Sequence, residues 1–285
     1  MPEPTDPPTK LLTNLIERRR WNDDHWTTVW PKRERFTDSV TPLLLDTIAL
    51  APDERVLDIG SGGGKTTIEA GRRVGRQGSA VGADLSGPLV DLACRRAGEA
   101  DSTNVTFHVV DMQHDHVDGG PFDAALSQFG VMFFDEPVTA FANIAAHLRD
   151  GGRIAFACWR APDRNPWMPA FALGQFLSPP PPPAPGKAPT GPCALADPER
   201  TTGILADAGF SAIRHTDVDT TVDAPQDAIV DDRQLEFMGI TEADMPGARR
   251  AVDEHMAQFR IDDELCRFPL SFQIFEARIF ASGRP

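Results

Sequence analysis

The feature that most constrains the fold of this chain is a hydrophobic run that contains an acid and passes directly into glycines. The run is Val56-Leu57-Asp58-Ile59, and Gly60-Ser61-Gly62-Gly63-Gly64 follows it. Glycines let a backbone turn tightly and approach a ligand closely. A buried strand that enters such a turn and then a helix predicts a small-molecule binding loop at the edge of a parallel sheet.

Strand and helix patterns alternate on the carboxyl side of this loop. The β-rich runs are 55–59, 79–84, 104–110, 122–127, 153–159, 211–218 and 267–279, and the helical patterns are 65–74, 87–98, 138–148 and 198–209. In the last run, apolar side chains recur at every second position from Phe268 to Ile274. The alternation predicts an α/β fold with a mostly parallel sheet and helices on both faces.

Other segments interrupt or flank this pattern. Amphipathic helices are expected at 10–22 and 36–50, and the proline run 179–183 excludes helix and interior strand. We therefore expect an N-terminal helical cap (1–50), a cofactor-binding core (51–162), a Pro-rich loop or lid (163–196), a core helix and strand (197–218), a helical lid insertion (219–266) and a final core strand (267–285).

Composition excludes several classes of protein. The formal charge of −14 repels phosphate backbones, which argues against a nucleic-acid partner. The four cysteines are scattered without a CxxC pair, so neither a metal site nor disulfides are expected. No apolar run is long enough to cross a membrane, and the polar start lacks the pattern of a signal peptide, so a cytoplasmic protein is expected.

Two nucleotide-binding interpretations of the glycine loop fail on spacing or charge. A P-loop needs four residues between its first glycine and Gly-Lys-Thr, but only three separate Gly60 from Gly64. A dinucleotide fingerprint needs a third glycine where Lys65 stands, and Asp58 would repel a pyrophosphate. A nicotinamide-dependent oxidoreductase is therefore the weaker alternative.

S-adenosylmethionine fits the loop better because it carries an ammonium group and a sulfonium but no phosphate. Asp58 can pair with the ammonium, directly or through water. Asp84 ends the second strand, where an acid can accept hydrogen bonds from both ribose hydroxyls, and Asp111 follows the third strand beside the adenine. The three acids fall at successive strand ends, along the edge where open α/β sheets bind ligands.

With these motifs the chain resembles the class I methyltransferases, and most closely the bacterial ubiquinone/menaquinone-methyltransferase-like group. The motifs are Glu54–Gly62, Asp84-Leu85-Ser86, Asp111-Met112, Phe122–Phe134 and Leu148–Arg153. The resemblance implies a Rossmann-like seven-stranded sheet whose last strand is antiparallel, and S-adenosylmethionine-dependent methyl transfer without a metal. It also implies roles for cofactor-binding residues: Trp26, Asp58, Gly60, Ser61, Gly62, Asp84, Leu85, Asp111, Met112, Ser127, Gln128 and Phe129.

The acceptor is expected to be a small molecule, but the sequence leaves O-, N- and C-methylation open. Met132, Trp159, Trp167 and Phe171 are candidates for lining its pocket. If the acceptor needs a general base, His25 beside Trp26 is the candidate. A protein that binds the cofactor and catalyses a cyclisation instead of methylation is a further alternative.

Overall fold

A computed structural model of the protein describes residues 14–177 and 186–280. Its centre is a seven-stranded sheet with the order β3-β2-β1-β4-β5-β7-β6. Only β7 runs opposite to the other six strands, as predicted. The strands are β1 (Arg55–Ile59), β2 (Ser79–Asp84), β3 (Val105–Val109), β4 (Phe122–Gln128), β5 (Leu148–Trp159), β6 (Ser211–Ala224) and β7 (Cys266–Arg278).

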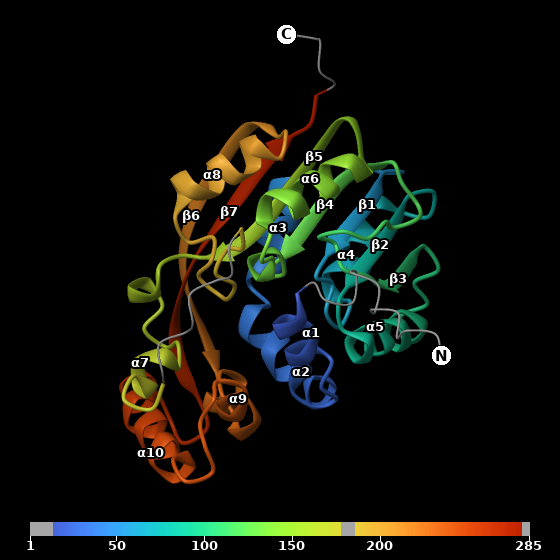
Figure 1. Ribbon diagram of the computed structural model, residues 1–285. Coiled ribbons are helices and arrows are strands. Elements are labelled where there is room, and N and C mark those ends of the chain that lie inside the picture. The colour runs from blue at the N-terminus through green and yellow to red at the C-terminus, as the bar shows by residue number, and fades with distance from the viewer. Residues whose placement is uncertain (1–13, 178–185, 281–285) are drawn as a thin grey trace, which may run out of the picture.

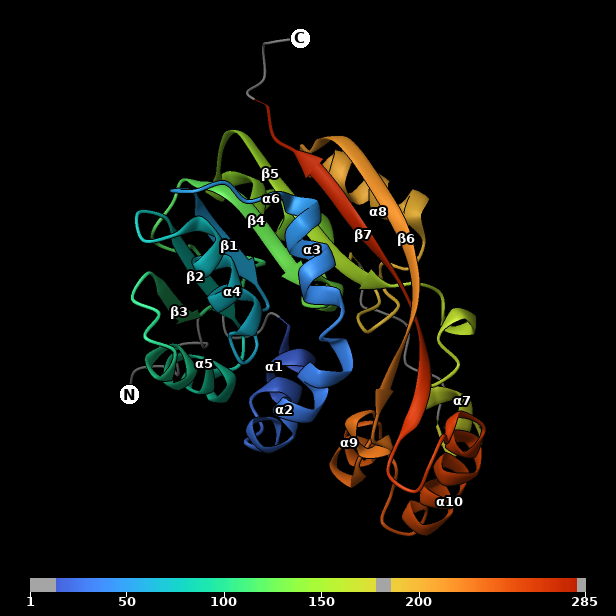
Figure 2. The same ribbon diagram turned by 180° about the vertical axis from the view of Figure 1, so that it is seen from behind.

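Helices cover both faces of this sheet. Figure 1 shows α6 (Pro137–His147) and α8 (Pro198–Asp207) in front of the sheet. Figure 2, from behind, shows α3 (Val40–Ile48) and α4 (Lys65–Val74), and α5 (Gly87–Glu99) packs on the β3 side. The central strands are almost wholly buried because helices cover both faces of the sheet, and this explains why hydrophobic residues predominate in them.

The N-terminal segment differs from the prediction in one respect. The helices expected at 10–22 and 36–50 are instead α1 (Leu15–Trp21), α2 (His25–Thr37) and α3, and residues 1–13 lie outside the described part. The hydrophobic pattern of the sequence did not predict α2, because its inward face mixes tryptophans with polar residues. Pro31 also lies within it.

The strands β6 and β7 form a long antiparallel pair that extends beyond the sheet. The pair carries α9 (Asp232–Phe237) and α10 (Met245–Met256), with α7 (Ala170–Leu173) beside α10 (Figure 1). The strand predicted to end at residue 218 continues to Ala224, which pairs with Cys266. The insertion between the strands is therefore 225–265, shorter than the expected 219–266.

The other expected lid, residues 163–196, begins within a 3-10 turn (Pro162–Arg164) and contains α7. Its proline run at 179–183 lies outside the described residues. Among the residues that are described, no helix has the length and apolar character that a membrane span requires.

Candidate functional site

The glycine-rich loop joins β1 to α4 and adopts a backbone that favours glycine. Gly60, Gly62 and Gly64 have positive φ angles of 68°, 52° and 84°. A Cβ atom at Gly60 would lie 2.7 Å from Cα of Gly130, because the loop after β1 touches the loop after β4. Positive φ and this contact together require glycine at position 60.

Asp58 precedes the loop in β1 and is 1% exposed. Its Oδ2 accepts a 2.6 Å hydrogen bond from Oγ1 of Thr67 in α4. Its Oδ1 and the Oγ of Ser61 are buried and have no hydrogen-bond partner in the described protein. Burial, together with the nearby charge of Asp84, raises the pKa of Asp58 to about 7. The hydrogen bond from Thr67 acts in the opposite direction and lowers the pKa. Since buried polar atoms are normally paired, these two mark a place where a polar ligand, and for the carboxylate a cation, would fit.

Asp84 ends β2 and braces the same loop. Its Oδ2 accepts a 2.7 Å hydrogen bond from the backbone N of Gly62, and its Oδ1 accepts one of 2.8 Å from Ser86 N. Burial raises the pKa of Asp84, and these backbone hydrogen bonds oppose the rise. The carboxylate of Asp84 thus lies beside the glycine loop.

Asp111 follows β3 and is 3% exposed. Its Oδ1 accepts a 3.1 Å hydrogen bond from Gln113 N, and its Oδ2 forms a 3.1 Å ion pair with Arg18 of α1. Met112 beside it is buried. The backbone carbonyl of Leu85 accepts a 3.2 Å hydrogen bond from Asn22 Nδ2, so the end of α1 touches the β2–α5 corner as well.

The end of β4 contributes Ser127, Gln128 and Phe129. Oγ of the buried Ser127 donates to Ile59 O at 2.7 Å, which ties β4 to the end of β1. The Oε1 of Gln128 accepts a 2.8 Å hydrogen bond from Thr41 Oγ1. Phe129 has a positive φ of 61° and stacks on Trp159 with centroids 4.1 Å apart and an interplanar angle of 8°. An aromatic residue rarely adopts that φ, so Phe129 is held there by its surroundings.

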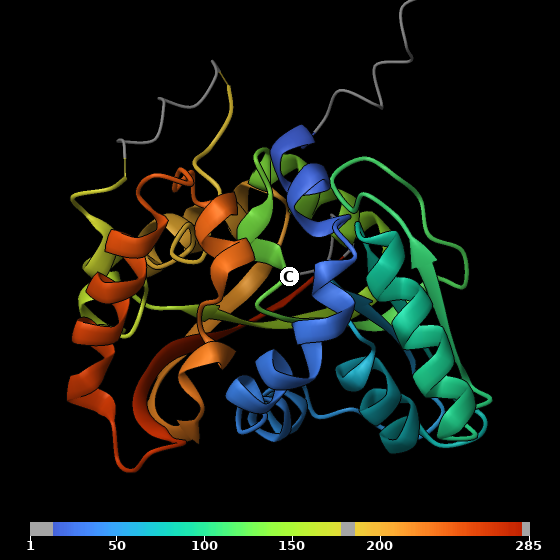
Figure 3. The same ribbon diagram turned by 90° about the horizontal axis from the view of Figure 1, so that it is seen from below.

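The helices α1 and α2 lie across the carboxyl ends of these strands. Viewed from that end in Figure 3, they run between α5 and the helices of the 225–265 insertion. Trp26 is 3% exposed and packs between Trp21, at 4.6 Å, and Phe237 of α9, at 6.1 Å. The ring of Trp30 lies directly on the loop, since a Cβ at Gly62 would be 2.2 Å from it.

His25 begins α2 and meets a carboxylate from the insertion. Its Nε2 lies 2.9 Å from Oδ2 of Asp231, and both side chains are about three-quarters buried, with 24% and 22% exposed. The Oδ1 of Asp231 accepts a 3.0 Å hydrogen bond from Gln234 N in a capping box, which fixes the carboxylate. The contact joins residues that are 206 positions apart.

The predicted acceptor-pocket residues divide into two groups. Trp159 and Trp167 lie in edge-to-face contact at 5.2 Å, and Phe36 of α2 packs on Trp167 at 4.8 Å. The buried indole N–H of Trp167 has no described partner, and Met132 is 1% exposed after β4. Phe171 lies apart, 48% exposed on α7 and stacked on His255 of α10.

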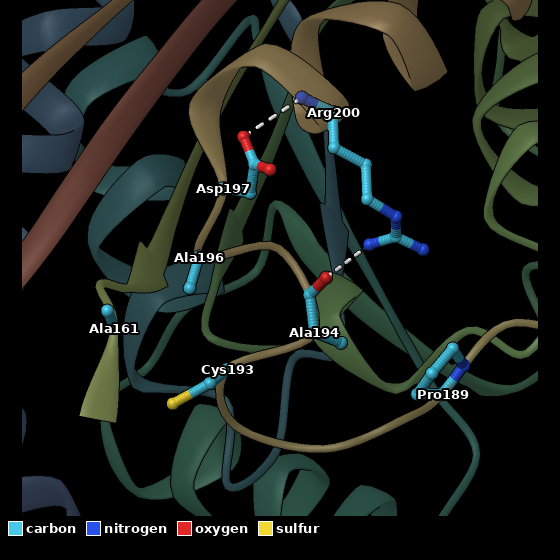
Figure 4. A pocket seen from close by; sticks show the side chains of 7 residues that line it. All are labelled: Ala161, Pro189, Cys193, Ala194, Ala196, Asp197 and Arg200. Atoms are coloured by element: carbon cyan, nitrogen blue, oxygen red, sulfur yellow. Dashed lines mark hydrogen bonds between the residues drawn. The ribbon is translucent and has the colours of Figure 1, made fainter. Parts of the chain in front are cut away.

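A pocket of about 460 Å³ opens elsewhere, between the end of β5 and the start of α8 (Figure 4). It contains none of the predicted site residues. Its walls are Ala161, Pro189, Cys193, Ala194, Ala196, Asp197 and Arg200.

Sequence reasoning did not find several residues of this region. Trp30 and Arg33 follow Trp26 at helical spacing, and assigning a helix to 25–37 would have put all three on one face. Thr67 lies nine residues after Asp58 and needs the strand–loop–helix geometry to reach it. Asp231 carries no local signal, because only the tertiary fold brings it to His25.

Comparison with known proteins finds a similarity over the glycine loop and the strands around it. Residues 56–152 match the methyltransferase domain family. Residues 56–152 thus resemble a methyltransferase domain, and the observed strand order with its antiparallel last strand is the Rossmann-like arrangement expected for that class.

The chain is also similar over part of its length to particular relatives. Over 138 residues it is 33% identical to the aklanonic acid methyltransferase DauC of Streptomyces sp. strain C5, covering 48% of this chain and 58% of that protein. It thus spans less than two thirds of the length of the curated relatives it matches first.

Solved structures extend the similarity of fold over most of the chain. A magnesium protoporphyrin IX methyltransferase of Synechocystis PCC 6803, determined with bound SAH (S-adenosylhomocysteine), has a TM-score of 0.57 at 15% identity and covers 93% of this chain and 99% of its own. The [4+2]-cyclase SpnF has a TM-score of 0.53 at 20% identity and covers 85% of this chain and 81% of its own.

Proposed function

We propose that this protein transfers the methyl group of S-adenosylmethionine to a small-molecule acceptor. The observation that carries the proposal is that two buried polar atoms at the glycine loop, Oδ1 of Asp58 and Oγ of Ser61, have no hydrogen-bond partner among the described residues. A cofactor that carries an ammonium group supplies the missing cation and donors. The match of residues 56–152 to methyltransferase domains supports the same proposal.

In this proposal each strand end has one task. Asp58 and the loop Gly60-Ser61-Gly62 bind the amino-acid end of the cofactor, with Ser127, Gln128 and Phe129 across from them. Asp84 and Leu85 bind the ribose side, and Asp111 and Met112 the adenine edge. Trp26 and the rest of α1 and α2 cover the cofactor. When bound, S-adenosylmethionine would supply an electrophilic methyl group, so the protein needs mainly to align the acceptor and exclude water.

We further propose that His25 is the general base for an acceptor that must lose a proton. Opposite the carboxylate of Asp231, Nε2 of His25 is the donor, which leaves Nδ1 of the neutral ring to accept the proton. Asp231 then stabilises the imidazolium. Trp159, Trp167 and Met132 would line the acceptor side, and Phe171 is the candidate from α7. The motif resemblance to the ubiquinone/menaquinone group and the names of the relatives, such as aklanonic acid methyltransferase, favour a small organic acceptor.

The first experiment is a thermal-shift comparison with S-adenosylmethionine, S-adenosylhomocysteine and NAD. A ligand at 100 times its Kd stabilises by about 2.7 kcal/mol, which raises the Tm by roughly 5–10 °C. Both adenosyl compounds should shift the Tm, and NAD should not. A shift with NAD alone would refute the proposal.

A pair of variants then tests the ribose assignment. Asp84→Ala should abolish measurable binding of S-adenosylhomocysteine while the chain stays folded, and Asp91→Ala, exposed on α5, should bind normally. Normal affinity in Asp84→Ala would contradict the assignment. Formation of S-adenosylhomocysteine with a panel of phenols, acids and amines separates methyl transfer from a cyclisation, which forms none.

A further inference from the structure

The indole N–H of Trp167 is buried without a hydrogen-bond partner. Trp167 is 7% exposed, and its Nε1 meets no acceptor among the described residues. The N–H groups of three other tryptophans are all paired: Trp21 with Glu17 at 3.0 Å, Trp26 with Arg20 O at 2.5 Å and Trp30 with Glu34 at 2.9 Å. Since a buried indole N–H normally has a partner, Trp167 marks a place where the oxygen of a ligand would fit.

The two residues before Trp167 hold its segment in place. The buried Asn165 exchanges two hydrogen bonds with the backbone of Ser271 in β7, at 2.8 and 2.9 Å. The carbonyl of Pro166 accepts a 2.6 Å hydrogen bond from Nε2 of His255 in α10. The position of the indole is therefore fixed before a ligand arrives, and a donor that is already in place binds with a smaller loss of entropy.

The ring of Trp167 lies among aromatic side chains. Phe36 of α2 packs on it edge-to-face at 4.8 Å, and Trp159 of β5 does so at 5.2 Å. Phe36 also contacts Phe268 of β7 at 5.7 Å, so three elements of the fold meet at these rings. No charged side chain is among the described ring contacts of Trp167. Such surroundings favour a neutral aromatic ligand, because a buried anion would lack a cation, and rings pack well on rings.

These aromatic side chains adjoin the glycine-rich loop through the end of β4. Trp159 stacks on Phe129 with centroids 4.1 Å apart, and Gly130 follows Phe129 in the chain. The Cα of Gly130 lies 2.7 Å from the position of a Cβ at Gly60. Direct packing therefore connects Trp167 to the loop that would bind the methyl donor.

We propose that Trp167 selects and orients the methyl acceptor by donating a hydrogen bond from Nε1 to a carbonyl oxygen of an aromatic ketone, an inference that rests on the proposed function. A carbonyl oxygen accepts hydrogen bonds and donates none, so it pairs the indole N–H without bringing in a second buried donor. The ring system of the ketone packs against Phe36 and Trp159. The hydrogen bond fixes the orientation of that ring system, and another atom of the same molecule receives the methyl group.

The test compares two probes of nearly the same shape in protein saturated with S-adenosylhomocysteine. The ketone is 2-acetylnaphthalene, and 2-isopropenylnaphthalene carries a methylene group in place of its oxygen. Ligand-detected NMR measures both Kd values for the wild type and for Trp167→Phe, which keeps a ring but lacks the N–H. The preference for the ketone should fall about tenfold in this variant, because one buried hydrogen bond is lost. In the control Trp21→Phe, which removes an N–H already paired with Glu17, the preference should stay as in the wild type.

A second measurement follows the N–H group itself. In protein labelled isotopically at the indole nitrogens, the signal of Trp167 is the one that disappears in Trp167→Phe. The ketone should shift the proton of this signal downfield, as a new hydrogen bond does, and the hydrocarbon should not. The signals of Trp21, Trp26 and Trp30 serve as internal controls and should move less, because these N–H groups already have partners.

The outcomes separate this inference from the function on which it rests. If the wild type fails to bind S-adenosylhomocysteine, the proposed function is wrong, and the inference falls with it. If the wild type binds that compound but neither probe, the proposed class of acceptor is refuted. An unchanged preference in Trp167→Phe would refute the hydrogen bond, and so would a Trp167 signal that the ketone leaves in place.

Discussion

Replacing Asp58 by Asn should stabilise the protein without ligand and remove its affinity for the cofactor. The carboxyl group is 1% exposed, and one of its oxygens has no described partner. Its pKa rises from 3.8 to about 7 because burial disfavours the charge. Between pH 4 and 7 the folded protein therefore retains a proton that the unfolded chain has released. Stability consequently falls as the pH rises through this window.

The size of the effect follows from the shift. About three pKa units at roughly 1.4 kcal/mol each give a destabilisation of about 4 kcal/mol above pH 7, and about 2 kcal/mol at pH 5. Asn keeps the shape of the side chain and can still accept the hydrogen bond from Thr67. The free energy of unfolding of Asp58→Asn should therefore exceed that of the wild type by about 2 kcal/mol more at pH 8 than at pH 5.

Urea unfolding at the two pH values measures this difference, with Asp91→Asn on the exposed face of α5 as the control. The control should track the wild type at both values. Calorimetry with S-adenosylhomocysteine should show that Asp58→Asn has lost affinity. A stability difference that is the same at pH 5 and pH 8 would refute the reasoning, and so would a variant that binds as tightly as the wild type.

Three further outcomes follow from the same structure. S-adenosylhomocysteine should bind about tenfold more weakly at pH 6 than at pH 8, because Asp58 must give up a proton on binding. Calorimetry at both pH values measures the difference, the Asp91→Asn control should show the same tenfold change, and equal affinities at pH 6 and pH 8 would contradict the prediction. Gly60→Ala should lower the free energy of unfolding by about 1–3 kcal/mol in urea unfolding and weaken ligand binding, because φ is positive at this position and the loop contacts Gly130. The control Gly203→Ala, in open space on α8, should be neutral or stabilising. A thiol reagent should first modify the exposed Cys94 and spare the buried Cys158, because burial raises the pKa of the Cys158 thiol to about 12. Peptide mapping identifies the residue that is labelled first, and a first label on Cys158 would contradict the prediction.

The core of the fold could be predicted because its signals are local. The alternation of buried strands and helices, and the acids Asp58, Asp84 and Asp111 at strand ends, follow from short stretches of sequence. The structure puts all three acids at one edge of the sheet, with Asp58 and Asp84 at the glycine loop.

The parts that sequence reasoning missed depend on contacts between distant segments. The helix α2 has a face of mixed character, because it lies across the carboxyl ends of the strands and does not pack against a uniform core. The continuation of β6 to Ala224 is decided by its pairing with β7, and the pattern of exposed polar residues alone does not specify it. The pairing of His25 with Asp231 likewise arises only when the insertion folds against α2.

The extended β6–β7 pair has a consequence for how such a protein can be engineered. Ala224 and Cys266 face each other in the ladder, so the segment 225–265 leaves and re-enters the sheet at neighbouring points. A short turn could close this gap while preserving the register of both strands, and a foreign helical segment could be grafted in its place. The segment 225–265 can thus be exchanged as one continuous cassette, together with the contact that its Asp231 makes to His25, while the strand ends that hold the three acids are left as they are.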